Sequence, residues 1–481
     1  MSTAPPYPAV LVNNVWSIGS GEPLDVFNPV TGERIACVAS ASAAQVDAAA
    51  RAATRAFASW RHTTPVERGA LLRRMADQVE AQRSCLEALQ QLNSGKPAFE
   101  AGLDVSDVVA TFAYYADLCA AGSGLLPQAV ALPDGDFSAT LEQVPVGVVG
   151  LVVPWNFPMV TTAWKLAPAL AAGCTVVLKP SELTPLAEIA LLEILVAAGL
   201  PPGVVNLVYG AGAVGQALVQ HPAVAKVSFT GSNATGQRIL QACGPRMQRV
   251  SLELGGKSSL LVLDDADLDQ AVALAVGGAF FNAGQMCSAT SRISVARPLY
   301  ARFLDQFVAA AEALHHGDPQ AADTTLGTLI SQKQQWAVLE RIQAGVADGA
   351  RLLSGGNALA GLGGYAIAPT VFTEAEHSRA LWQEEIFGPV ACVRAIDSDA
   401  QAVAVANDSD YGLVATIVAG DLDRARRVAA GLEVGTVWIN TPQLIFPQTG
   451  WGGFKHSGLG RELGPWGLQA FQELRHTVAP R

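Results

Sequence analysis

The sequence predicts an α/β fold built on a parallel β-sheet with helices on both faces. Between residues 146 and 263, short runs of aliphatic residues alternate with helical segments, a rhythm that is typical of parallel sheets. The 481 residues are too many for one core and enough for two or three domains. Half of the residues are hydrophobic and only 15% are charged, so a large core can form.

The first predicted elements are helical. Residues 43–60 have the spacing of an amphipathic helix, with Ser42 as N-cap and Asp47 four residues before Arg51, and residues 66–121 continue this spacing. Two strands follow, at 139–144 and 146–153, separated by Pro145. The later predicted elements are strands at 175–178, 204–208, 226–229, 260–263 and 437–440, helices at 185–198 and 212–220, and an extended tail at 473–478.

Charge and cysteine content exclude several classes of partner. The formal net charge of −11, with no basic cluster, argues against nucleic acid. Seven cysteines form no CxxC pair, so neither a metal site nor a disulfide framework is predicted, and free thiols suit a reducing compartment. The first residues lack the pattern of a signal peptide, and the long uncharged stretches are interrupted by polar residues and glycine. We therefore expect a cytoplasmic protein that binds neither nucleic acid nor membrane.

Three loops after predicted strands could bind a nucleotide. Residues 210–215, which include Gly212, match the GxGxxG fingerprint, but no acidic residue ends a strand about twenty residues later, as a ribose contact requires. A tight strand-to-helix turn is the alternative there. The loop 229–236 offers helix N–H groups and the Ser232 hydroxyl to a pyrophosphate. Lys179 and Glu182 could share the hydroxyls of a ribose; the alternative for both loops is a solvated turn.

Seven motifs, in their order and spacing, resemble those of the NAD(P)-dependent aldehyde dehydrogenase superfamily. The motifs are PWNFP (154–158), KPSE (179–182), FTGS (229–232), LELGGK (252–257), GQMC (284–287), EEIFGP (384–389) and GRELG (460–464). The resemblance runs from about residue 25 to the C-terminus. It implies the aldehyde dehydrogenase fold: a variant Rossmann NAD-binding domain (1–121 and 148–253), an α/β catalytic domain (254–455) and a small β bridging element (122–147 and 467–481). It also implies a homodimer or homotetramer.

The resemblance assigns the catalytic residues. Cys287 would be the nucleophile, a thiolate whose pKa is lowered. The side-chain amide of Asn156 and the backbone N–H of Cys287 would stabilise the oxyanion. Glu253, between two leucines, would activate water after burial has moved its pKa toward neutrality. Lys165 and Glu462 would move protons near the site. Without the resemblance, the simpler interpretations are a buried small thiol, a turn-forming asparagine and a surface ion pair.

The resemblance also assigns a cofactor site. It places Lys179 and Glu182 at the adenine ribose, Ser232 at the pyrophosphate, and Glu385 at the nicotinamide ribose with Phe387 packed nearby. Trp155 and Gly212 complete the predicted set. Because a carboxylate at Glu182 repels a 2′-phosphate, we expect NAD to be preferred over NADP, although some relatives with this glutamate accept both.

Three segments, 284–292, 451–455 and 461–467, look like the betaine-aldehyde and ω-aminoaldehyde branch. In that branch an aromatic box surrounds the cationic end of the substrate. The matching positions here are Phe157, Trp164, Phe281 and Trp451; the alternative is a generic apolar tunnel. Asp104 and Asp107 lie three residues apart on a predicted helix and match an acidic tunnel mouth that would steer ammonium aldehydes. The alternative for these two is a pair of solvated helix carboxylates.

Three positions depart from that branch. It often has tyrosine at position 157 and tryptophan at position 281, whereas this chain has phenylalanine at both. Ile445 fills a position where good betaine-aldehyde oxidisers have a smaller residue. We therefore expect ω-aminoaldehydes such as 3-aminopropanal or 4-aminobutanal to be better substrates than betaine aldehyde. Three alternatives remain: a broad aliphatic or aromatic aldehyde dehydrogenase, a non-redox thiol acyltransferase or hydrolase, and a structural protein with a vestigial site.

Overall fold

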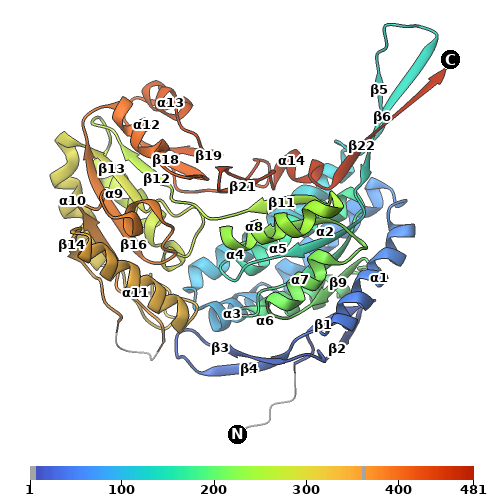
Figure 1. Cartoon of the computed structure of the whole chain (residues 1–481), viewed down its shortest axis with the longest axis horizontal. Coiled ribbons are helices and arrows are strands. Elements are labelled where there is room, and N and C mark those ends of the chain that lie inside the picture. Colours follow the sequence, from blue (N-terminus) through green and yellow to red (C-terminus); the bar gives the residue numbers. More distant parts are fainter. Residues whose placement is uncertain (1–6, 360–363) are drawn as a thin grey trace.

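The computed structural model describes residues 7–359 and 364–481. The N-terminal residues that we examined for a signal peptide lie outside this range. Two large sheets and a three-stranded arm organise the chain (Figure 1). The first large sheet has the strand order β2-β1-β9-β8-β7-β10-β11-β21. Its members are β1 (Val10–Val12), β2 (Val15–Ser17), β7 (Val148–Val152), β8 (Thr175–Lys179), β9 (Val205–Val208), β10 (Val224–Thr230), β11 (Arg249–Glu253) and β21 (Gly458–Leu459).

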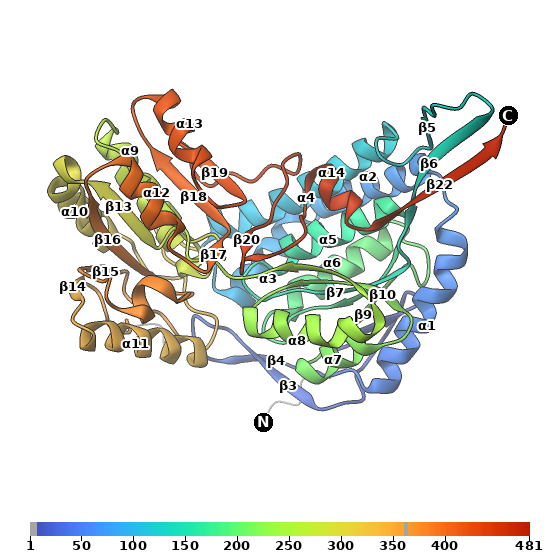
Figure 2. The ribbon, with the colours of Figure 1, turned by 45° about the horizontal axis from the view of Figure 1, so that its top comes forward.

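Strands β7 to β11 of this sheet are parallel, and helices cover both of its faces (Figure 2). One face packs on α2, α4, α5 and α6, and the other on α1, α7 and α8. The bounds of the connecting helices are Pro158–Ala172 for α5, Pro185–Ala197 for α6, Gly212–Gln220 for α7 and Asn233–Cys243 for α8, which the 3-10 turn η1 (Gly244–Arg246) follows. The predicted parallel sheet with two covered faces is therefore confirmed.

The N-terminal helices also follow the prediction. They are α1 (Ala43–Trp60), α2 (Pro65–Ala81), α3 (Arg83–Ser94) and α4 (Ala98–Ala120). Ser42 caps α1 in a capping box with Gln45, and Arg51 pairs with Asp47 at 2.7 Å. Sequence reasoning did not predict the strands that precede α1, namely β1, β2 and the hairpin of β3 (Pro23–Phe27) with β4 (Arg34–Ala39).

The second large sheet has the order β14-β15-β16-β13-β12-β18-β19 and is parallel except where β14 meets β15. Its strands are β12 (Ser259–Val262), β13 (Arg292–Ala296), β14 (Arg351–Ser354), β15 (Thr370–Thr373), β16 (Val390–Ile396), β18 (Val414–Val418) and β19 (Thr436–Ile439). The helical segments around it are α9 (Leu268–Phe280), η2 (Phe281–Gly284), α10 (Arg297–Glu312), α11 (Gln332–Ala347), η3 (Arg379–Gln383), α12 (Asp399–Asn407) and α13 (Leu422–Ala430). A two-stranded ladder joins β17 (Tyr411–Gly412) to β20 (Phe454–Lys455).

The arm consists of β5 (Gln128–Val130), β6 (Phe137–Pro145) and β22 (Gln472–Pro480), and it projects from the body with the C-terminus at its tip (Figures 1 and 2). Helix α14 (Gly464–Gln469) leads into it. The predicted extended tail is thus the strand β22, which pairs with β6 along its whole length. Leu474 and Val478 on this strand are exposed. The predicted domain limits stay a prediction.

In residues 7–359 and 364–481, no helix combines the length and the apolar character that a membrane crossing requires. The same described residues contain no cluster of three or more histidine, cysteine or acidic side chains that could hold a metal ion.

Candidate active site

A cavity of about 870 Å³ lies where the two large sheets face each other. Asn156 follows β7, Ser232 follows β10 and Glu253 ends β11, so one wall comes from the carboxyl ends of parallel strands, where ligands bind in such sheets. The opposite wall comes from the second sheet and its loops. It includes Cys287, Met286, Glu385, Phe387, Thr416 and residues 441–445.

The loop that carries Cys287 begins in a strained turn. Asn282 and Ala283 both adopt left-handed backbone conformations (φ 52° and 53°), which cost free energy in residues with a Cβ atom. The side chain of Gln285 holds the turn in place. Its Nε2 donates to the carbonyl oxygens of Asn282 and Thr328 at 3.1 Å, and its Oε1 accepts from the backbone N–H of Ile330 at 2.9 Å. The backbone before Cys287 is therefore fixed by interactions that only the folded chain provides.

The predicted lowering of the Cys287 pKa is wrong for this structure. Burial raises the pKa of the thiol above its ordinary value, and the nearby carboxyl groups of Glu385 and Glu253 raise it further. The backbone N–H groups of Ser288 and Cys287 lower it by a smaller amount. The shift is upward because the thiol lies in a cavity, partly withdrawn from solvent, near two acidic side chains. A base that takes the thiol proton would activate it.

Asn156 lies beside the Cys287 loop, as an oxyanion donor must. Its Nδ2 donates to the carbonyl oxygen of Gln285 at 2.9 Å, and its own carbonyl oxygen accepts from Nδ2 of Asn282 at 3.2 Å. The side chain is buried and lines the cavity. One amide N–H is used by Gln285, which leaves the other for a ligand.

Glu253 is a buried carboxyl group with an unsatisfied oxygen. Its Oε2 has no hydrogen-bond partner among the described residues. Burial, and secondly the nearby carboxylate of Glu462, raise the pKa of Glu253 well above its usual range, whereas Lys165 and Arg461 lower it. The upward direction is the one that we predicted. A carboxylate whose pKa is raised in this way is a stronger base toward water.

Lys165 and Glu462 form a buried ion pair, so the surface ion pair that we considered as an alternative is wrong. The side chain of Lys165 is fully buried and that of Glu462 is 6% exposed. Lys165 Nζ contacts Glu462 Oε1 directly and donates to the Thr230 hydroxyl at 2.6 Å. The pair adjoins Glu253, because both side chains shift its pKa.

Four of the predicted cofactor residues line the same cavity. Glu385 accepts from the backbone N–H of Gly256 at 3.0 Å, and burial raises the pKa of Glu385 to about 7. Phe387 adopts a left-handed backbone conformation (φ 58°), and its ring packs edge-on against Trp155 with 5.3 Å between centroids. Ser232 accepts from the backbone N–H of Thr235 as the N-cap of α8. Its position is that of an anion site at a helix start.

Lys179, Glu182 and Gly212 lie outside the cavity lining, at the carboxyl ends of the neighbouring strands β8 and β9. Lys179 is buried; its Nζ donates to the carbonyl oxygen of Gly210 at 2.6 Å and lies 3.7 Å from the carboxylate of Glu182. The solvated turn that we considered is therefore wrong for Lys179, whereas the side chain of Glu182 is 42% exposed. Gly212 is the first residue of α7, so residues 210–215 form a strand-to-helix turn.

The predicted aromatic residues come together in the cavity wall. Phe157 and Phe281 stack with their planes 9° apart and their centroids 6.5 Å apart. Trp164 and Trp451 meet edge-on at 5.5 Å. Ile445 lies in the same lining.

Of the two aspartates expected at an acidic mouth, Asp104 is not a free charge. Asp104 is 3% exposed, and its Oδ2 accepts from Nζ of Lys96 and Nε2 of Gln90, both at 2.6 Å. Asp107 accepts from Nε1 of Trp164 at 2.6 Å, and burial raises its pKa to about 7. Both line the cavity; Asp104 is buried and Asp107 half-buried, and each accepts hydrogen bonds from other side chains. The reason is that this face of α4 packs inward, so a neighbouring lysine neutralises Asp104.

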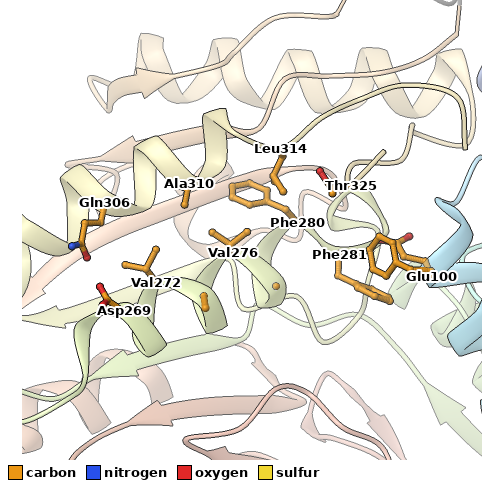
Figure 3. Close-up of a pocket in the computed structure, with 13 residues that line it drawn as sticks. Glu100, Asp269, Val272, Val276, Phe280, Phe281, Gln306, Ala310, Leu314 and Thr325 are labelled. Carbon is orange, nitrogen blue, oxygen red and sulfur yellow. The ribbon is translucent and has the colours of Figure 1, made fainter. Parts of the chain in front are cut away.

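A smaller cavity of about 590 Å³ adjoins the first between α9, α10 and the start of α4. Gln306 and Asp269 lie at one end, and Phe281 and Glu100 at the other (Figure 3). Its lining includes neither Cys287 nor Glu253. Ala273, Gly277 and Phe281 line both cavities.

Sequence reasoning missed several residues that shape the site. Lys96 and Glu100 stand at the start of α4, Gln334 donates to the carbonyl oxygen of Phe387 at 2.8 Å, and Gln443 donates to that of Ser288 at 3.2 Å. The only local signal was the Gly95-Lys96-Pro97 turn before a helix. None of these roles could be read locally, because each contact joins segments that are far apart in the chain.

The chain is similar to known proteins over almost its whole length. The chain is 42% identical over 465 residues to betaine aldehyde dehydrogenase 1 of Oryza sativa subsp. japonica, with 95% of this chain and 92% of that protein covered. It is 41% identical over 477 residues to human retinal dehydrogenase 2, with 98% and 91% covered. Betaine aldehyde dehydrogenase of Staphylococcus aureus in complex with NAD+ superposes with a TM-score of 0.96 at 36% identity, over 98% of this chain and 95% of that one. Residues 16–477 match the aldehyde dehydrogenase family. This chain therefore belongs to the aldehyde dehydrogenase family.

Proposed function

We propose that this chain oxidises an aldehyde to a carboxylic acid with NAD as the acceptor. The observation that carries the proposal is the convergence of Cys287, Asn156 and Glu253 on one cavity that Glu385, Phe387 and Ser232 also line. A thiol acyltransferase would need the thiol but would not need the part of the cavity that Glu385, Phe387 and Ser232 line. Following NADH formation with a panel of aldehydes tests the proposal, and acyl transfer without NADH would favour the non-redox alternative.

The residues of this chain can carry out each protein-side step. A base removes the proton of Cys287, and the sulfur adds to the aldehyde carbon. The N–H groups of Asn156 and Cys287 then stabilise the alkoxide. NAD+, when bound, would accept one hydride from this adduct, and loss of that hydride would leave a thioester on Cys287. Glu253 takes a proton from water, which attacks the thioester and releases the acid and the thiol. Aldehyde, NAD+ and water thus give acid, NADH and a proton.

The cofactor site fits a dinucleotide in the features that the structure provides. The N-terminus of α8, capped by Ser232, suits a pyrophosphate. The buried carboxyl group of Glu385 would hold the nicotinamide ribose beside the strained Phe387. Glu182, 3.7 Å from Lys179, would meet the adenine ribose and repel a 2′-phosphate. NAD is therefore the proposed cofactor, with NADP a poorer one.

Removing the Asn156 amide should slow the reaction strongly. We expect Asn156→Ala to lower kcat by about 10²- to 10³-fold, because one oxyanion donor contributes about 2.7–4 kcal/mol. Steady-state NADH formation measures this effect. Asn357→Ala, which removes an exposed amide outside the cavity lining, is the matched control. An Asn156→Ala variant within about threefold of the wild type would contradict the assigned role, since the smallest expected loss is about a hundredfold.

The proposed substrates are ω-aminoaldehydes such as 3-aminopropanal and 4-aminobutanal. Support comes from the two tryptophans and from Asp107, a carboxyl group that a substrate ammonium would ionise. The similarity of the chain to aminoaldehyde dehydrogenase 2 of Zea mays, at 42% identity over 466 residues, points the same way.

Ile445 should discriminate against a trimethylammonium group. We expect a higher kcat/KM for 4-aminobutanal than for betaine aldehyde, because the β-branched side chain in the cavity wall crowds the three methyl groups. Measuring both aldehydes at saturating NAD+ provides the test, and Ile445→Ala should narrow the difference. If betaine aldehyde were the better substrate of the wild type, this assignment would be wrong.

A broad aliphatic or aromatic aldehyde dehydrogenase is the second candidate. The 41% identity to human retinal dehydrogenase 2 over 98% of the chain favours it, as does the largely apolar wall of the cavity. Comparable kcat/KM values for hexanal and 4-aminobutanal would support this reading over the aminoaldehyde one.

We also infer that the arm of β5, β6 and β22 joins subunits into a homodimer or homotetramer. The exposed apolar side chains of Leu474 and Val478 on the projecting strand β22 support this inference. Light scattering of the full chain, and of a Leu474→Asp variant, would test it. The seven free cysteines fit the reducing cytoplasmic compartment that we propose.

A further inference from the structure

A lysine lies behind one wall of the catalytic cavity. Lys96 stands between α3 and α4, and its side chain is 1% exposed. Its Nζ donates to Asp104 Oδ2 at 2.6 Å and lies 3.9 Å from the ring centroid of Phe157. Asp104 and Phe157 both line the cavity. The protein's own ammonium therefore already occupies a face of Phe157, in a cation–π contact.

Because of this contact, two groups are not free to bind a substrate cation. The ring face of Phe157 attracts positive charge through its quadrupole, and Lys96 supplies that charge. The carboxylate of Asp104 is also engaged, because it accepts from Lys96 and from Nε2 of Gln90. A second ammonium brought to this wall would meet a like charge in a poorly solvated place.

On the neighbouring wall, by contrast, the acidic side chain of Asp107 is bound to neutral groups. Asp107 accepts hydrogen bonds from two neutral donors, Nε1 of Trp164 at 2.6 Å and the hydroxyl of Thr111 at 3.2 Å. A carboxylate on the indole N–H polarises the ring and makes its face more attractive to a cation. Trp451 packs edge-on against Trp164, so a second indole lies within reach of the same substrate group.

Glu100 is the other acidic side chain beside Lys96. It is buried, and its Oε1 accepts from the backbone N–H of Asn282 at 2.8 Å. Burial raises the pKa of Glu100 to about 7, whereas Lys96 lowers it. Glu100 lies near Phe281 at one end of the smaller cavity, and it is absent from the lining of the catalytic one (Figure 3). It therefore supports the nucleophile loop and does not face the substrate.

We propose that Lys96 is a positioning residue that decides which wall of the cavity recognises a cationic aldehyde. By occupying Phe157 and pairing with Asp104, it leaves the ammonium end of the substrate to Asp107, Trp164 and Trp451. The proposal deepens the proposed function and rests on it. It names a specificity determinant that does not itself touch the substrate.

The test compares 3-aminopropanal with butanal. The two aldehydes have the same number of heavy atoms and differ by an ammonium in place of a methyl group. The ratio of their kcat/KM values is the charge preference. We expect Lys96→Met to raise this preference about tenfold, because it frees Asp104 and the face of Phe157. Asp107→Asn should lower it by a similar factor. The double variant K96M/D104N should bring it back to within about fivefold of the wild type, since the freed carboxylate is then missing and only the face of Phe157 stays free.

A purely structural role of Lys96 gives a different result. In that case Lys96→Met lowers kcat/KM for both aldehydes by one factor and leaves the charge preference unchanged, which would overturn the proposal. If the Lys96→Met variant does not fold, the Asp104→Asn variant provides the test, because it leaves the ammonium of Lys96 without its counterion. We then expect the charge preference to fall about threefold or more, and an unchanged preference overturns the proposal equally. If the wild type forms no NADH from either aldehyde, the proposed function fails instead, so the two failures are distinguishable.

Discussion

Replacing Cys287 with alanine is expected to lower NADH formation by about 10⁴-fold or more, because loss of the attacking atom removes the whole covalent route. The donor of Asn156 and the cavity would remain, but no thiol would lie among the other lining residues. Stopped-flow detection of NADH on mixing with aldehyde and NAD+ measures the loss, including any single-turnover burst.

Cys85→Ala is the matched control for this variant. Cys85 is an exposed free cysteine on α3 and lies outside the cavity lining, so its loss should leave the rate within about twofold of the wild type. A Cys287→Ala variant that kept more than about one per cent of the wild-type rate would show that another group forms the bond to the aldehyde carbon, since the expected loss is about 10⁴-fold.

The second large effect is expected for Glu253→Gln. An amide cannot take a proton from water, so hydrolysis of the thioester should slow by about 10²- to 10⁴-fold while the preceding steps continue. We therefore expect a burst of one NADH for each active site, followed by a slow steady rate. Mass spectrometry of the quenched protein should find the acyl group on Cys287.

The pH profile adds an independent check on Glu253. Burial raises the pKa of Glu253, so the group is protonated and inactive as a base at low pH, and becomes a base as pH rises through that raised pKa. Hydrolysis in the wild type should accordingly rise with pH, and Glu253→Gln should lose this rise. Glu433→Gln, at an exposed surface ion pair with Lys455, is the control. A Glu253→Gln variant with a wild-type steady rate and no burst would show that another group activates water.

The helices and strands whose sequence signals lie within one segment of the chain were predicted well. Helices α1 and α7 have the predicted bounds. Ser42 caps α1 and the glycine-rich turn of residues 210–212 precedes α7, so both starts have signals within one segment. Strands β8 to β10 and β12 fall within about two residues of prediction, because runs of buried aliphatic residues mark the core of a parallel sheet. Strand β1 was missed: it is three residues long and is stabilised by pairing with β9, some two hundred residues away in the chain.

The candidate site likewise has features that the sequence predicted and features that depend on the fold. The motifs predicted which residues of the cavity would carry chemistry, and the structure brings Cys287, Asn156 and Glu253 to one cavity. The direction of the Cys287 pKa was not predictable, because it depends on how deeply the sulfur is buried and on carboxyl groups from other segments. The pairing of Asp104 with Lys96 was missed for a similar reason, since a helix of uncertain orientation gives no sign of which face points inward.

The sequence by itself determined the family and the reaction class and predicted the reacting groups, because all three inferences depend on residue types in a fixed order along the chain. The tertiary structure decided how those groups are charged and which of them a substrate can reach. Burial and carboxyl groups from other segments raise the pKa values of Cys287 and Glu253, and the ammonium of Lys96 lies on one aromatic ring of the cavity wall. Electrostatic energies depend on distance and solvent exposure, and only the folded chain defines both.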